Sequence, residues 1–261
     1  MGVITVKQLE NVLKQAKLFE EQGKFLHALQ LYHTLLKNPK YKRIATVRLA
    51  SAYERLKKAD LAKEILQKYI SENENDDEIK KLFCHFLIRN NYNEEALFFL
   101  STISRDENPE ILYLMGIANY KLRNFKIAEL NFIEFVNENS KSDLLPEALF
   151  ILAKIQIEMN KIEEALNNAN KSAELFFQNF EIHELLARIY YSKEMYYHAQ
   201  KAVKNALKIN DKELSLLKCA GKIYFKLEEF KKAADYFMKY LEYYPNDEVR
   251  ELLNICKKYI N

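Results

Sequence analysis

Small residues recur along this chain with a period close to 34, and this repeat restricts the possible folds more than any other feature. In each of seven segments an alanine follows a short polar turn, and successive alanines stand 34, 34, 32, 37, 34 and 34 residues apart. The alanines of this series are Ala28, Ala62, Ala96, Ala128, Ala165, Ala199 and Ala233. A unit this short cannot bury its own apolar face, so we expect the units to stack on one another.

A second series of small residues supports the same register. Twelve residues before each alanine of the first series stand Ala16, Ala50, Cys84, Gly116, Ala153, Ala187 and Gly221. Two small positions twelve residues apart in one unit predict two antiparallel helices whose axes approach closely. Only 4 glycines and 4 prolines in 261 residues agree with a nearly all-helical chain, because strand-rich folds need many more turn residues.

The segments MGIANYKLRNFKIAELNF (115–132) and LARIYYSKEMYYHAQKAV (186–203) show the combined pattern of small and aromatic residues most clearly. This pattern resembles the tetratricopeptide repeat (TPR), a helix-turn-helix unit of 34 residues. The resemblance covers the whole chain and implies an all-α fold, a right-handed α-solenoid of seven TPR helical hairpins plus a C-terminal capping helix. It implies one superhelical domain over residues 1–261, with repeats at roughly 9–42, 43–76, 77–108, 109–142, 143–179, 180–213 and 214–245 and the capping helix at 246–261.

Three helix starts can be predicted from side chains that cap the first turn. Asn108 precedes Pro109, and Asn246 precedes the capping helix, so each asparagine is expected to accept a backbone N–H as an N-cap. Thr5 and Gln8 have the spacing of a capping box.

The chemistry-bearing residues do not point to an enzyme. The chain has no glycine-rich phosphate loop, no HExxH and no GxSxG motif. Its 5 histidines are scattered, and its 3 cysteines lack CxxC spacing. We therefore expect no catalytic residue, no metal, no cofactor and no small-molecule substrate.

Net charge and hydropathy restrict the kinds of partner and the cellular compartment that we expect for this protein. With 40 basic and 37 acidic residues, the net charge of +3 is too small to attract nucleic acid or an anionic membrane to the whole protein. Residues 1–75 hold fourteen basic and eight acidic side chains, so a nucleic-acid binder stays an alternative. The chain has no run of about 18 apolar residues, so we expect no membrane-spanning helix. We expect a cytoplasmic protein, or a periplasmic one if a leader has been removed.

The resemblance also implies where a partner binds. In TPR proteins the first helices of successive repeats line a concave groove, and the ninth position of the last three repeats carries Lys154, Arg188 and Lys222. Aromatic residues without an evident packing role accompany these cations, as in a binding surface rimmed by charge. The expected groove residues of repeats four to seven are Tyr113, Ile117, Tyr120, Phe150, Lys154, Arg188, Tyr191, Lys218, Lys222 and Phe225.

These observations favour a non-catalytic scaffold or adaptor for protein–protein interaction. We expect it to hold a peptide or partner segment of acidic and apolar character in the groove of repeats four to seven. The alternative is a structural subunit of a larger assembly, such as an envelope, secretion or motility complex, that uses its convex face or its ends.

Overall fold

The computed structural model describes residues 6–105 and 108–260, and within them every regular element is helical. The prediction of an all-α helical-repeat fold is confirmed, whereas the predicted capping box at Thr5 lies outside the described residues. The helices are α1 (Val6–Glu21), α2 (Phe25–Leu35), α3 (Pro39–Arg55), α4 (Ala59–Glu72), α5 (Asp77–Arg89), α6 (Asn93–Leu100), α7 (Glu110–Lys121), α8 (Phe125–Glu138), α9 (Leu145–Glu158), α10 (Ile162–Leu175), α11 (Phe180–Ser192), α12 (Tyr196–Ile209), α13 (Leu214–Lys226), α14 (Phe230–Tyr243) and α15 (Asp247–Ile260).

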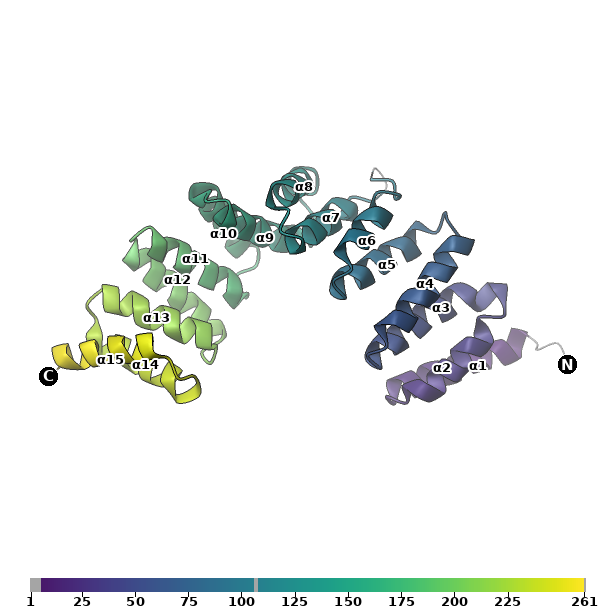
Figure 1. The fold of residues 1–261 in the computed structure, drawn as a ribbon, viewed down its shortest axis with the longest axis horizontal. Helices are drawn as coiled ribbons and strands as arrows, with labels where there is room; N and C mark the ends of the chain where they lie inside the picture. Colours follow the sequence, from purple (N-terminus) through teal and green to yellow (C-terminus); the bar gives the residue numbers. More distant parts are fainter. Residues whose placement is uncertain (1–5, 106–107, 261) are drawn as a thin grey trace. The chain divides into compact units, whose positions relative to one another are not determined.

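The chain divides into two compact units, 1–124 (unit 1) and 125–261 (unit 2). Within unit 1, α1 packs on α2, α3 on α4 and α5 on α6, and α7 follows against α6. Within unit 2, α8 packs on α9, which pairs with α10, and the pairs α11–α12 and α13–α14 follow in chain order (Figure 1). Each unit is therefore a row of helices in which every helix contacts its neighbours along the sequence.

The small residues of both series lie where helices touch. The alanines of the first series are all fully buried, and so are Ala16, Cys84, Ala153 and Ala187 of the second. The Cys84 thiol lies 3.9 Å from the carbonyl oxygen of Ala96, so two small positions twelve residues apart face each other across the helix pair α5–α6. Close approach of the two helix axes explains why no larger side chain stands there.

A left-handed residue ends the first helix of each sequence repeat. Among the described residues, φ is positive at Gly23, Lys57, Asn91 and Arg123 in unit 1 and at Asn160, Glu194 and Glu228 in unit 2. The next residue donates its N–H to a carbonyl five positions earlier, as from Lys58 to Tyr53 at 2.9 Å, which is the Schellman arrangement. The spacing of the left-handed residues equals that of the alanines, so the turns follow the period read from the sequence.

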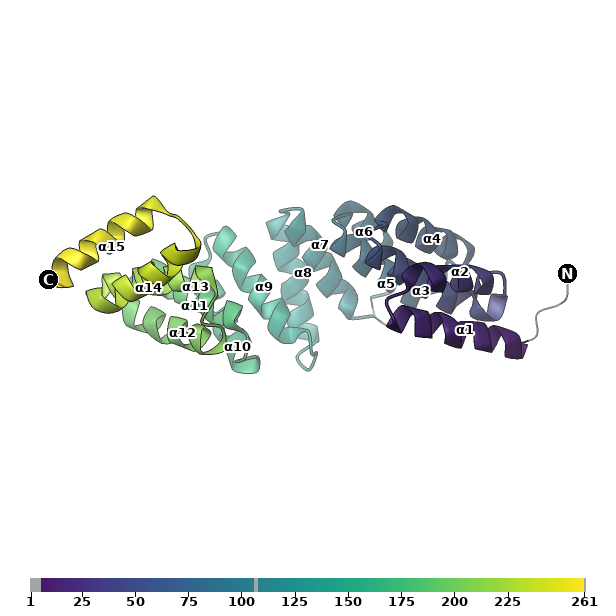
Figure 2. The same ribbon diagram turned by 90° about the horizontal axis from the view of Figure 1, so that it is seen from below.

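Helix α15 covers one end of unit 2. Its buried residues Val249, Leu253 and Cys256 face inward, and it packs mainly on α14 (Figure 2). The side-chain oxygen of Asn246 accepts the N–H of Val249 at 3.0 Å, which confirms the predicted N-cap of this helix.

The prediction that Asn108 caps a helix is wrong. Helix α7 begins at Glu110, and the Asn108 side chain instead donates to the carbonyl oxygen of Ser104 at 3.1 Å. The residue is buried, so its amide needs a partner inside the protein, and the Ser104 carbonyl supplies it. None of the described helices is long and apolar enough to cross a membrane.

Candidate functional site

Four of the predicted groove residues come together in unit 2. A hollow of about 440 Å³ lies between α11 and α13. Its lining residues are Glu184, Arg188, Tyr191, Ser215, Lys218, Cys219 and Lys222. Their spacings of three, four and seven along each helix place them on one face of α11 and one face of α13. We refer to this feature as the α11–α13 hollow.

The remaining predicted residues lie elsewhere. Phe150 and Lys154 belong to α9 of unit 2, where the Lys154 ammonium lies 5.2 Å from the centre of the Phe150 ring. Phe225 is on α13 but does not line the hollow. Three further predicted residues, Tyr113, Ile117 and Tyr120, lie on α7 of unit 1.

Positive charge predominates in the hollow. Its lining holds three cations, Arg188, Lys218 and Lys222, against one carboxylate, Glu184. The Glu184 carboxylate accepts a hydrogen bond from the Ser215 hydroxyl at 3.0 Å. Arg188 is exposed and forms no ion pair with any described residue. An exposed guanidinium with five N–H donors is suited to binding a carboxylate from outside the chain.

The two lysines are already paired. Glu248, in the first turn of α15, lies 2.6 Å from the Lys222 ammonium and 3.0 Å from the Lys218 ammonium. Hydrogen bonds from Lys222 and then from Lys218 hold the pKa of the Glu248 carboxyl below its ordinary value. The capping helix thus supplies an acidic side chain to the cations at the edge of the hollow.

The aromatic residues have a packing role that the sequence did not reveal. Tyr113 is only 7% exposed. Phe150, Tyr191 and Phe225 are half-buried and pack against the apolar core of unit 2. The Tyr191 ring meets the Tyr196 ring edge-on at 5.6 Å, and burial raises the pKa of the Tyr191 phenol, so that its hydroxyl stays neutral. The expectation that these rings lack packing partners is therefore wrong, because helix packing inside each unit buries Tyr113 and covers part of the other three rings.

The hollow does not contain an activated nucleophile. Burial raises the pKa of the Cys219 thiol to about 12, so the thiolate is scarce at neutral pH. Ser215 has a carboxylate partner and no histidine partner. Across the described residues, no group of three or more histidine, cysteine or acidic side chains is arranged to hold a metal ion.

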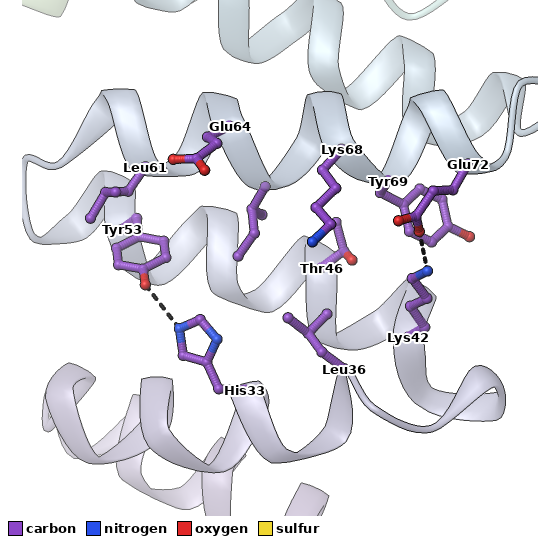
Figure 3. A pocket seen from close by; sticks show the side chains of 11 residues that line it. His33, Leu36, Lys42, Thr46, Tyr53, Leu61, Glu64, Lys68, Tyr69 and Glu72 are labelled. Atoms are coloured by element: carbon purple, nitrogen blue, oxygen red, sulfur yellow. Dashed lines mark hydrogen bonds and ion pairs between the residues drawn. The ribbon is translucent and has the colours of Figure 1, made fainter.

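A second hollow, of about 450 Å³, lies in unit 1 and was not predicted from the sequence. Side chains of α2, α3 and α4 line it together with Leu36, the C-cap residue of α2. His33 and Leu36 lie below, and Leu61, Glu64 and Lys68 lie above (Figure 3). The His33 imidazole lies 2.9 Å from the hydroxyl of Tyr53, and Lys42 pairs with Glu72. Most of the lining comes from the second helices of the repeats, whereas all the groove residues predicted from the sequence lie on first helices.

Charges in this second hollow are balanced. Lys42 and Lys68 stand against Glu64 and Glu72, so the lining has no net preference for an acidic or a basic partner. The α11–α13 hollow is therefore the stronger candidate for a site of defined specificity.

A third feature in unit 1 is structural. Asp76 accepts hydrogen bonds from the Arg43 side chain at 2.8 Å, from the Tyr69 hydroxyl and from the Ile79 N–H. The bond from Arg43 is the main reason that the pKa of the Asp76 carboxyl lies below its ordinary value. This single side chain connects α3, α4 and α5.

Comparison with known proteins places the chain among the helical repeats. Two family models described as tetratricopeptide repeat match it, one over residues 13–77 and one over residues 220–247. No curated protein sequence matches it.

Solved structures share the fold over most of the chain, and two of them over nearly all of it. A tetratricopeptide repeat protein from Parabacteroides merdae is 20% identical, with 95% of this chain and 98% of that chain covered and a TM-score of 0.66. The C-terminal part of a TPR repeat-containing protein from Cytophaga hutchinsonii is 16% identical, with 92% and 99% covered and a TM-score of 0.69. YrrB, a TPR protein described as having an unusual peptide-binding site, is 18% identical, with 74% and 97% covered and a TM-score of 0.60. At these identities the likeness is one of fold.

Proposed function

The chain is a tetratricopeptide-repeat protein, and from this premise we propose that it is a non-catalytic protein-interaction scaffold whose unit 2 binds an acidic, partly apolar segment of a partner protein. The site we propose is the α11–α13 hollow, extended by Lys154 and Phe150 on α9. TPR proteins bind proteins or peptides, and YrrB is described as having a peptide-binding site.

The main support for this proposal is that Arg188 is exposed and has no ion pair with a described residue. It lines the hollow together with Tyr191. Lys154 and Lys222 occupy the same repeat position on α9 and α13, so the three cations recur from helix to helix along unit 2. A segment with several carboxylates could meet them in register.

We expect the partner segment to be partly apolar because an aromatic ring, that of Tyr191, lines the hollow. Tyr191 is half-buried, so one part of its ring packs on the protein and the other can contact a ligand. Aromatic contacts of this kind supply most of the affinity at protein interfaces, whereas exposed charges mainly set register and association rate.

Fluorescence anisotropy with a designed probe tests the proposal. The probe is a fluorescein-labelled peptide in which Asp and Glu alternate with Leu and Phe, and its matched control carries Asn and Gln instead. We expect the acidic probe to bind more tightly than the control, and Arg188→Gln to weaken only the acidic probe. Lys201→Gln removes the same charge from an exposed lysine of α12 outside the hollow and should leave binding unchanged.

Two outcomes would contradict the proposal. Equal binding of both probes would refute selection by charge. Absence of binding to either probe, together with concentration-dependent oligomers in light scattering, would favour the structural-subunit alternative. The exposed side chains Ile127, Leu130 and Ile133 on one face of α8 would suit that alternative.

A further inference from the structure

Two of the lysines that line the α11–α13 hollow already bind a carboxylate, and that carboxylate belongs to the chain itself. Glu248 contacts the ammonium groups of Lys218 and Lys222, which stand one helical turn apart on α13 and reach the same side of it. Both lysines line the hollow, whereas Glu248 comes from α15 and does not. The pair of lysines is therefore a place where a carboxylate binds, and Glu248 shows the chemistry that it accepts.

The contact can open without unfolding the capping helix. The Glu248 side chain is 54% exposed, and only its own rotation is needed to release the two lysines. The docking of α15 depends on other residues, because Val249, Leu253 and Cys256 are buried and Asn246 caps the first turn. Displacement of Glu248 thus exchanges one carboxylate for another at an otherwise intact surface.

We propose that Lys218 and Lys222 form a carboxylate-binding subsite for an acidic protein segment, and that Glu248 is the internal competitor which this segment displaces. The proposal rests on the function proposed above and identifies which cations take the second carboxylate of the partner. Arg188, which has no ion pair with a described residue, takes the first. A partner therefore needs at least two carboxylates, one for each side of the hollow.

The expected effect of removing the competitor is modest. Exposed ion pairs contribute little because water and salt screen them, and the free energies measured for such pairs correspond to about a two- to fivefold change in affinity. Glu248→Gln keeps the shape of the side chain and removes its charge. The variant should bind the acidic probe about two- to fivefold more tightly than the wild-type protein.

Glu251 supplies the matched control. It lies on the same helix, is exposed and pairs with no described residue, so Glu251→Gln changes the net charge by the same amount without touching the lysines. Lys218→Gln with Lys222→Gln removes the subsite itself. In that background, Glu248→Gln should no longer tighten binding, which makes the set a double-mutant cycle.

The experiment is anisotropy titration of the acidic probe and its neutral control with the full chain and each variant, at low and at physiological salt. Circular dichroism melting confirms that α15 remains docked in Glu248→Gln. The proposal is supported if Glu248→Gln tightens binding of the acidic probe and Glu251→Gln does not. The neutral control must be unaffected, and the effect must require both lysines. Equal effects of Glu248→Gln and Glu251→Gln, or no effect of either, overturn it.

The two proposals fail in different ways. If Arg188→Gln weakens the acidic probe and Glu248→Gln leaves it unchanged, the site binds acidic segments but Glu248 does not compete. If no variant binds the probe, Glu248→Gln included, the function proposed for unit 2 is itself refuted.

Discussion

The ring of Phe237 occupies the space that a side chain at position 221 would need. A Cβ atom built on Gly221 would lie 2.4 Å from Cε1 and 2.5 Å from Cδ1 of that ring. Phe237 is fully buried in α14, so its ring cannot move aside into solvent. The glycine therefore sets how closely α13 approaches α14.

Replacement of this glycine should destabilise unit 2. We expect Gly221→Ala to lower the free energy of unfolding by about 1–3 kcal/mol, because the added methyl group overpacks the contact with Phe237. Thermal and urea unfolding followed by circular dichroism measure this change. Unfolding curves that coincide with those of the wild-type protein would show that the helix pair separates without cost.

A glycine should have the opposite effect in the turn between α13 and α14. Glu228 has φ of 60°, where a residue with a Cβ atom is strained by about 1–2 kcal/mol. Since glycine loses about 0.5–1 kcal/mol through backbone entropy, Glu228→Gly should raise the free energy of unfolding by about 0.5–1 kcal/mol. The control Lys204→Gly, at an exposed position inside α12, should lower it by about 1 kcal/mol. A loss of stability in Glu228→Gly would refute the argument from strain.

Asp76 should give unit 1 a pH-dependent stability. Its carboxyl pKa is lower in the folded state than the ordinary value near 3.9. The stabilisation is therefore complete above that ordinary value and is lost as pH falls through the folded pKa. At pH 7 we expect Asp76→Asn to cost about 0.2–1 kcal/mol, because asparagine keeps the N-cap oxygen but loses the charge that pairs with Arg43.

Urea unfolding at a series of pH values checks this expectation. The difference between the wild-type protein and Asp76→Asn should shrink as the pH falls below about 4. Glu74→Gln, in the same loop and without an ion pair to a described residue, should remain close to the wild-type protein throughout. A difference that is constant with pH would mean that the charge of Asp76 contributes nothing.

Within the proposed site, the aromatic ring should matter more than the exposed cation. We expect Tyr191→Ala to weaken binding of the acidic probe by about 1–3 kcal/mol and Arg188→Ala by about 0.2–1 kcal/mol. Added salt should slow association more than it speeds dissociation. Stopped-flow anisotropy separates the two rates, and melting curves are needed for Tyr191→Ala because its ring also packs on the core. Equal losses for both variants would assign the affinity to charge.

The repeat and its buried positions could be predicted because they depend on the size of the side chains at the helix contacts. Ala28 and Cys84 stand where two helix axes meet, and any chain with this period must place small residues there. The all-helical fold follows from the same series together with the scarcity of glycine and proline. The N-cap at Asn246 was also predictable, since it joins residues only three positions apart.

The residues of the proposed site could be predicted only in part. The ninth-position cations Arg188 and Lys222 were identified from the period, and the structure places both in one hollow. The sequence does not reveal that Lys222 is already paired. Its partner Glu248 lies 26 positions away and reaches it only when α15 docks beside α13. The buried state of Tyr113 was missed for a related reason, since its burial depends on packing between helices.

The sequence by itself determined the period, the helical content, the small residues at the helix contacts and the cations that recur on the first helices. The left-handed turn residues recur with the same period, although the residue types Lys57 and Glu228 do not themselves indicate that conformation. Only the tertiary structure decided which charges pair, which rings pack and where a hollow remains. The physical reason is the distance along the sequence over which each effect acts. Side-chain size and helical period act within one repeat. Ion pairs and ring contacts join side chains of different helices, many of which meet only after the repeats have stacked.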